Sequence, residues 1–74
     1  MLKVKFSPGT QGYKKYGPEI EIEWQGGVIK DLIAQLAIET TEIGGVLVNH
    51  SHQGLNAKLA DDSLVVFLPV ACGG

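Results

Sequence analysis

The residues best suited to chemistry stand at the end of the chain, which reads Cys72-Gly73-Gly74. A terminal carboxyl group has a pKa of about 3.3–3.7, so the Gly74 carboxylate is ionised at neutral pH and can attack the α-phosphate of ATP held by a partner. Glycine suits such an end, because a segment without side chains can thread a narrow channel into another protein's active site. The alternative is that both glycines are incidental, since chain termini tolerate glycine and are often disordered.

Cys72 is the only cysteine, and it admits two interpretations. It can be an accessory thiol for sulfur transfer, or a small residue without a chemical role. We favour the second, because reactive thiols have basic neighbours and the sequence places none close by. A single cysteine cannot form an internal disulfide, which indicates a reducing compartment and hence a cytoplasmic protein.

The composition argues against several classes of function. The 74 residues carry six lysines, no arginine and a net charge of −2, whereas nucleic-acid modules are usually basic. No apolar run approaches the ~20 residues of a membrane span, and the N-terminus lacks a signal peptide's apolar region. His50 and His52 do not form a recognised zinc spacing with Cys72, so we expect no metal. A chain this short also leaves little room for an enzyme pocket, and we expect no catalytic side chains.

Two segments alternate apolar and charged residues, which is typical of strands with one solvated face. They are residues 2–6, with outward lysines, and residues 19–24, with outward glutamates. Paired antiparallel, they would set opposite charges side by side across the ladder, so the glutamates form a solvated face rather than a catalytic pair. Residues 7–18 are rich in glycine and proline and predict a long loop, whose tyrosines we expect to pack on the sheet edge.

Residues 28–39 change to a helical period and predict one amphipathic helix of about three turns. Its apolar stripe consists of Ile29, Leu32, Ile33 and Leu36. Gly44-Gly45 is expected to end the following connection, residues 46–49 to form a strand, and residues 50–56 to form a turn region.

Residues 64–68 are apolar throughout, which favours a central strand covered on both faces. If this strand lies parallel to the first, the helix falls within a right-handed crossover. The expected fold is therefore α+β: a β-grasp, or ubiquitin-like, roll with a mixed sheet of four to five strands and one main helix. We expect the domain to span residues 1–68, and residues 69–74 to form a flexible tail.

The segment from residue 59 to the end resembles the MoaD/ThiS family of ubiquitin-like sulfur carrier proteins. In the MoaD branch this stretch typically reads L-x-D-G-D-E-V-x-F-x-P-P-V-x-G-G. The positions that match in register are Leu59, Asp61, Val65, Phe67, Pro69, Gly73 and Gly74. The chain departs from the pattern at Asp62-Ser63, where the family has Gly-Asp, and Val70-Ala71 is closer to the ThiS branch.

This resemblance implies a carrier cycle. An adenylating enzyme of the ubiquitin-activating type would use ATP to activate Gly74, and a cysteine desulfurase or rhodanese would supply sulfur for a thiocarboxylate. The acceptor would be the large subunit of molybdopterin synthase, or thiazole synthase in the ThiS branch. We favour molybdopterin biosynthesis for the molybdenum or tungsten cofactor. Thiazole formation, tRNA thiolation, cysteine synthesis and protein modification are alternatives, and an interaction module with an incidental diglycine is an alternative from another class.

The same resemblance implies that partners dock on the sheet face beside the tail. The candidate docking residues are Phe67, Leu68, Pro69 and Val70. Since every residue of this strand is apolar, the sequence leaves two interpretations open: these residues complete the core, or they form an exposed patch.

Overall fold

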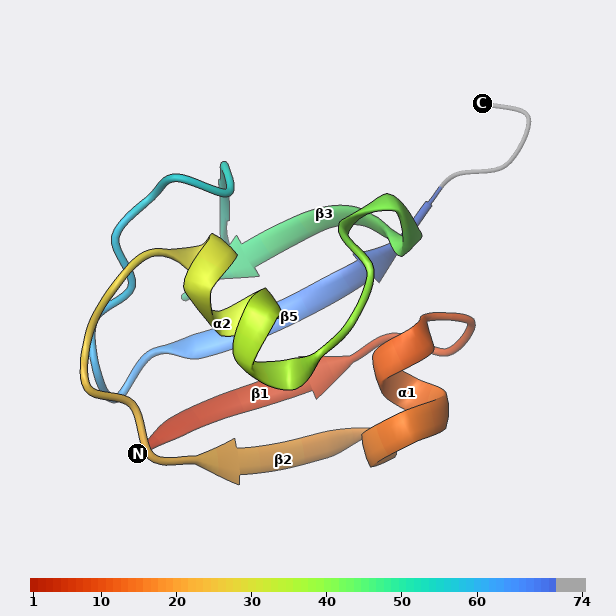
Figure 1. Cartoon of the computed structure of the whole chain (residues 1–74), viewed down its shortest axis with the longest axis horizontal. Helices are drawn as coiled ribbons and strands as arrows, with labels where there is room; N and C mark the ends of the chain where they lie inside the picture. Colours follow the sequence, from red (N-terminus) through yellow and green to blue (C-terminus); the bar gives the residue numbers. More distant parts are fainter. Residues whose placement is uncertain (71–74) are drawn as a thin grey trace.

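The computed structural model describes residues 1–70, which form one five-stranded sheet with two α-helices. In chain order the elements are β1 (Leu2–Phe6), α1 (Gln11–Tyr16), β2 (Glu19–Ile22), α2 (Ile29–Leu36), the 3₁₀ turn η1 (Thr40–Glu42), β3 (Ile43–Val48), β4 (Ser51–Gln53) and β5 (Leu64–Pro69). The strand order is β2-β1-β5-β3-β4, with β1 parallel to β5 and the other pairs antiparallel. Helix α2 crosses one face of the sheet (Figure 1), so the predicted β-grasp architecture is confirmed.

The charged hairpin of β1 and β2 forms as the alternation predicted, although β2 ends at Ile22, two residues before the predicted end of the strand. Lys3 pairs with Glu21 and Lys5 with Glu19 across the antiparallel ladder. The Lys3 ammonium also lies 3.4 Å from the Glu19 carboxylate, diagonally across the two strands. Because about half of each side chain is exposed to solvent, this ion pair contributes little to stability.

Helix α2 is shorter than the predicted 28–39 segment. Its first turn is capped by Asp31, whose carboxylate accepts a hydrogen bond from the Val28 backbone N–H at 3.1 Å. It ends because Ala37 adopts a left-handed conformation with φ of 57°, which returns Ile38 to the core. The buried face consists of the four predicted residues, Ile29, Leu32, Ile33 and Leu36.

A second helix, α1, lies in the connection that was predicted to be a loop. The Thr10 hydroxyl begins it by accepting a hydrogen bond from the Tyr13 N–H at 3.2 Å. Tyr16, at its end, stacks on Phe6 with ring centroids 5.7 Å apart, and its hydroxyl donates to the Leu36 carbonyl at 2.7 Å. A helix of six residues is marginal alone, so these tertiary contacts hold α1 in place. Tyr16 thus packs as expected, whereas Tyr13 remains exposed.

We expect Gly12→Ala to lower the free energy of unfolding by about 1 kcal/mol or more. A Cβ at this position in α1 would overlap the ring of Phe6. That ring cannot move aside easily, because it is stacked between Tyr16 and Phe67. Urea denaturation measures the change, with exposed Lys14→Ala as the control on the same helix. A more stable Gly12→Ala variant would show that the ring has room to shift.

Strand β3 begins earlier than predicted, and Gly44-Gly45 lies inside it rather than before it. The predicted turn region 50–56 also contains the short strand β4. The chain reverses between these strands in two residues, Asn49 and His50, whose φ angles are 52° and 71°. Positive φ at both central positions is the geometry of a tight type I′ hairpin, which the sequence pattern did not reveal.

The turn before β5 accommodates the departure from the family pattern noted at Asp62-Ser63. Asp62 has a φ of 64°, in the region that glycine occupies most easily, and aspartate is among the residues that tolerate it. The Met1 ammonium donates to the Asp61 carboxylate at 2.8 Å, next to this turn. This hydrogen bond raises the pKa of the Met1 amino group and lowers the pKa of Asp61.

Candidate functional site

The predicted reactive residues Cys72, Gly73 and Gly74 lie outside the described residues, so the roles assigned to them remain predictions. The structure does describe the strand that leads to them. Strand β5 is central in the sheet, between β1 and β3, and ends at Pro69. The candidate site is therefore built from the end of β5 and the sheet face around it.

The side chains of β5 alternate between two environments. Val65 and Phe67 point into the core, with exposures of 0% and 1%, whereas Leu64, Val66 and Leu68 are half-buried on the other face. The docking prediction for Phe67 is therefore wrong, because this ring stacks on Phe6 in the core at a centroid distance of 5.6 Å. The expectation that β5 is covered on both faces is not met within residues 1–70, because the residues of its second face are only half-buried.

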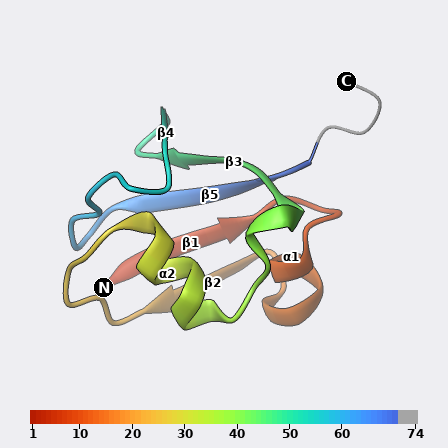
Figure 2. The same cartoon turned by 45° about the horizontal axis from the view of Figure 1, so that its top comes forward.

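Three half-buried apolar side chains, Leu47, Val66 and Leu68, form what we call the outer patch. Val66 pairs with Leu47 across β5 and β3, and Leu68 follows Val66 on the same face of β5. Helix α2 packs on the opposite side of the sheet (Figure 2). Within residues 1–70, the outer patch therefore faces away from the α2 layer.

Polar side chains border the outer patch on both sides. Lys5 pairs with Val66 from β1, and His52 pairs with Leu47 from β4. An apolar centre within a polar border is the usual anatomy of a protein-binding surface. Leu68, a predicted docking residue, belongs to this surface.

The outer patch continues into the start of the tail. Pro69 pairs with Ile43 at the end of the β5–β3 ladder, and both Pro69 and Val70 are exposed. Val70 has 46% of its surface accessible. The chain thus leaves the sheet from one end of the apolar surface, with two further predicted docking residues accessible.

The histidines lie at the opposite edge of the sheet from the charged hairpin. His50 is in the β3–β4 turn, and His52 is on β4. Within the part of the chain that the structure describes, no three His, Cys, Asp or Glu side chains gather as metal ligands would. Neither helix in that part is long and apolar enough to cross a membrane.

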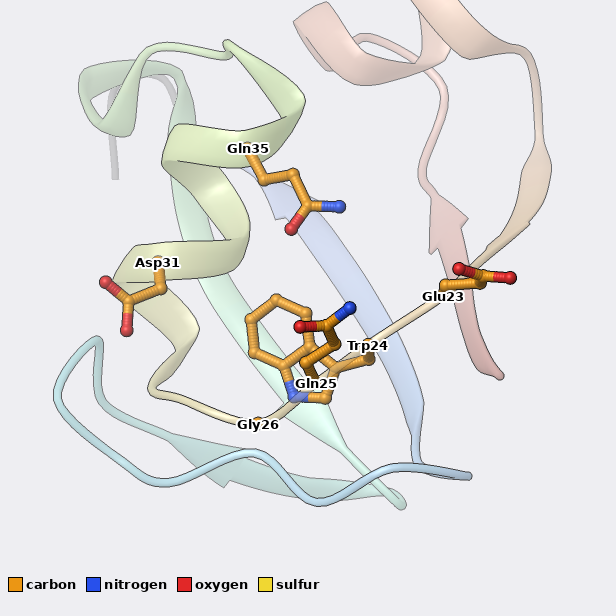
Figure 3. Close-up of a pocket in the computed structure, with 6 residues that line it drawn as sticks. All are labelled: Glu23, Trp24, Gln25, Gly26, Asp31 and Gln35. Atoms are coloured by element: carbon orange, nitrogen blue, oxygen red, sulfur yellow. The ribbon is translucent and has the colours of Figure 1, made fainter.

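A shallow hollow lies beside Trp24 (Figure 3). The Trp24 indole N–H donates to the Leu59 carbonyl at 2.7 Å, which fixes the ring. The two acidic side chains that line the hollow, Glu23 and Asp31, lie on opposite sides of it, and Asp31 already caps α2. This geometry offers no paired carboxylates for acid–base chemistry. The hollow follows β2, which ends at the same end of the sheet as β5 begins, with β1 between them.

Comparison with known proteins adds a structural likeness. No protein-family model matches the sequence, and no curated protein matches it. The crystal structure of SAMP1 from Haloferax volcanii superimposes with a TM-score of 0.62 at 17% sequence identity, over 99% of this chain and 98% of that one. The likeness extends over essentially both full chains, and in the described residues the last strand, β5, is central and parallel to β1, as expected for the predicted roll. The chain therefore has the ubiquitin-like β-grasp fold.

Proposed function

We propose that this chain is a ubiquitin-like sulfur carrier, whose Gly74 carboxylate is activated by a partner and converted to a thiocarboxylate. One observation carries the proposal: the central strand of a ubiquitin-like fold runs past an apolar outer patch and ends at Pro69, five residues before the terminal Gly74. The patch would hold the partner, and the remaining residues would reach its active site.

The activation step requires only the terminal carboxylate from this chain. A Gly74 carboxylate oxygen attacks the α-phosphorus of ATP and displaces pyrophosphate, which gives an acyl-adenylate. A persulfide sulfur then attacks the acyl carbon and displaces AMP. A thiol next cleaves the resulting acyl disulfide, becoming a disulfide itself and releasing the thiocarboxylate. The nucleotide and the phosphate-binding groups belong to the adenylating enzyme, which suits an acidic chain without arginine.

Among the pathways, we favour molybdopterin biosynthesis, with the chain as the small subunit of molybdopterin synthase. The support is the match of Leu59, Asp61 and Val65 to the MoaD pattern, together with the turn at Asp62, whose φ is one that the family's glycine adopts easily. The acceptor would then be the large subunit of that synthase, and a cysteine desulfurase or rhodanese would supply the sulfur. Thiazole synthase is the corresponding acceptor if the chain serves the ThiS pathway.

The test is the intact mass of the purified chain after incubation with the cognate adenylating enzyme, ATP and sodium sulfide. Sulfide attacks the acyl-adenylate directly, so the expected product carries one sulfur atom in place of one oxygen atom. A reaction without ATP is the control and should leave the mass unchanged. An unchanged mass in the complete reaction counts against the carrier function. Transfer of Gly74 to lysines of other proteins, rather than to sulfide, would identify a protein modifier.

A further inference from the structure

Gly44 is the point where the start of β3 meets the start of the tail. Ile43 pairs with Pro69 and Gly45 pairs with Leu68, so β3 advances two residues while β5 advances one. Gly44 is the extra residue of this β-bulge. Bulges bend a strand locally, and this one lies beside the last paired residue of β5.

The backbone of Pro69 and Val70 occupies the space that a side chain at position 44 would need. A Cβ built on Gly44 would overlap the Pro69 carbonyl oxygen, and it would lie 2.7 Å from the Pro69 carbonyl carbon and 2.9 Å from the Val70 Cα. All three atoms are backbone, so no rotamer change can relieve the overlap. The φ angle of Gly44 is not positive, so the requirement here is space rather than a special backbone conformation.

The neighbouring Gly45 provides a contrast within the same strand. A Cβ at Gly45 would lie 2.7 Å from His52 Nε2 and 3.5 Å from Leu68 Cδ1. His52 is exposed, so its imidazole can rotate away. A methyl group at position 45 would therefore displace the His52 side chain. A methyl group at position 44 would instead displace the backbone of Pro69 and Val70, where the tail begins.

We propose that Gly44 is a positioning residue, which fixes the direction in which the chain leaves the sheet at Val70. The consequence for activation rests on the proposed carrier function. The four residues from 71 to 74 span at most about 14 Å. When a partner holds them extended, a change of direction of about 20° at Val70 would therefore displace the terminal carboxylate by about 5 Å. A reacting atom misplaced by about 1 Å can cost about 100-fold in rate.

The structural half of this inference is tested by NMR on the chain alone. Cys72 is the only cysteine, so a nitroxide spin label on its thiol reports where the tail lies relative to the folded domain. We expect Gly44→Ala to change the set of backbone amides that the label broadens, and Gly45→Ala to leave that set unchanged. Identical broadening in the wild type and both variants would overturn the proposal.

A second measurement needs no variant, and so it remains decisive if Gly44→Ala does not fold. In wild-type protein without the spin label, the ¹H–¹⁵N heteronuclear NOE of the Val70 amide should match the values in β5. A value as low as that of a freely moving chain end would overturn the proposal, because the contact with Gly44 would then not direct the tail.

The functional half is tested by the kinetics of adenylation with the cognate adenylating enzyme. We expect Gly44→Ala to lower kcat by about 10- to 100-fold and to change KM for the chain much less, because Leu47, Val66 and Leu68 of the outer patch still dock. Gly45→Ala should retain the wild-type kcat. A wild-type kcat for Gly44→Ala would overturn this assignment. Absence of adenylation of the wild type would instead contradict the carrier function, and the NMR results would stand independently.

Discussion

Deletion of Gly74 is expected to abolish formation of the thiocarboxylate and to leave the stability of the domain unchanged. The shortened chain still ends in a carboxylate, but that group stands one residue, or about 3.3–3.6 Å, short of the nucleotide. Attack on the α-phosphorus requires the reacting atoms to come within about 3–3.5 Å, so the loss of one residue removes productive contact. The buried core is complete by Phe67, which explains why the melting temperature should not change.

Gly74→Ala is the matched control for this deletion, because it keeps the length of the tail and adds one methyl group. We expect adenylation of this variant to be slower than that of the wild type, because the methyl group must pass through a channel suited to glycine, but to remain detectable. Binding of the deletion variant to the adenylating enzyme should persist, since the outer patch is intact. A deletion variant that retains full activity would favour the interaction module with an incidental diglycine.

The elements that could be predicted from the sequence have apolar residues at a regular spacing, and only one type of secondary structure brings residues of that spacing onto one face. The Lys3 and Lys5 alternation against Glu19 and Glu21 predicts both strands and their pairing, because a slip of one residue would expose the apolar face. The stripe beginning at Ile29 predicts α2 and its buried face for the same reason.

Elements held by tertiary contacts were not predictable from local pattern. Helix α1 has six residues with a glycine at the second position, and it depends on the stacking of Tyr16 on Phe6 and on the hydrogen bond from Tyr16 to the Leu36 carbonyl. The end of α2 at Ala37 is similar, because the left-handed residue there is alanine rather than the glycine that usually ends a helix in this way. In both places the surrounding structure overrides the local preference of the chain.

The candidate site was predictable in position but not in orientation. The apolar run from Leu64 to Leu68 indicates a strand leading to the tail, yet it contains no polar residue that marks an outward face. Only the pairing of β5 with the alternating strand β1 assigns Phe67 to the core and Leu68 to the outer patch. The local sequence places Gly44 in a connection for a related reason, since the need for a residue without a side chain arises from Pro69, which is 25 positions away in the sequence.

Phe67 and Leu68 are adjacent residues, and their truncation is expected to have opposite consequences. Phe67→Ala should lower the free energy of unfolding by about 3–5 kcal/mol, because a fully buried ring stacked on Phe6 leaves a cavity. A domain of this size has a total stability of about 4–11 kcal/mol, so the variant should be largely unfolded well below the melting temperature of the wild type. Thermal denaturation followed by circular dichroism measures this loss.

Leu68→Ala should lower the free energy of unfolding by less than about 1.5 kcal/mol, because the side chain is only half-buried. It should weaken binding to the adenylating enzyme by tenfold or more, which corresponds to about 1.4 kcal/mol, since the few residues that carry most of the binding energy cluster near the centre of an interface. Isothermal titration calorimetry measures the affinity, with Gln35→Ala on the exposed side of α2 as the control. Unchanged affinity for Leu68→Ala would remove the outer patch from the docking surface. A stability loss equal to that of Phe67→Ala would mean that β5 does not divide its side chains between the core and the partner.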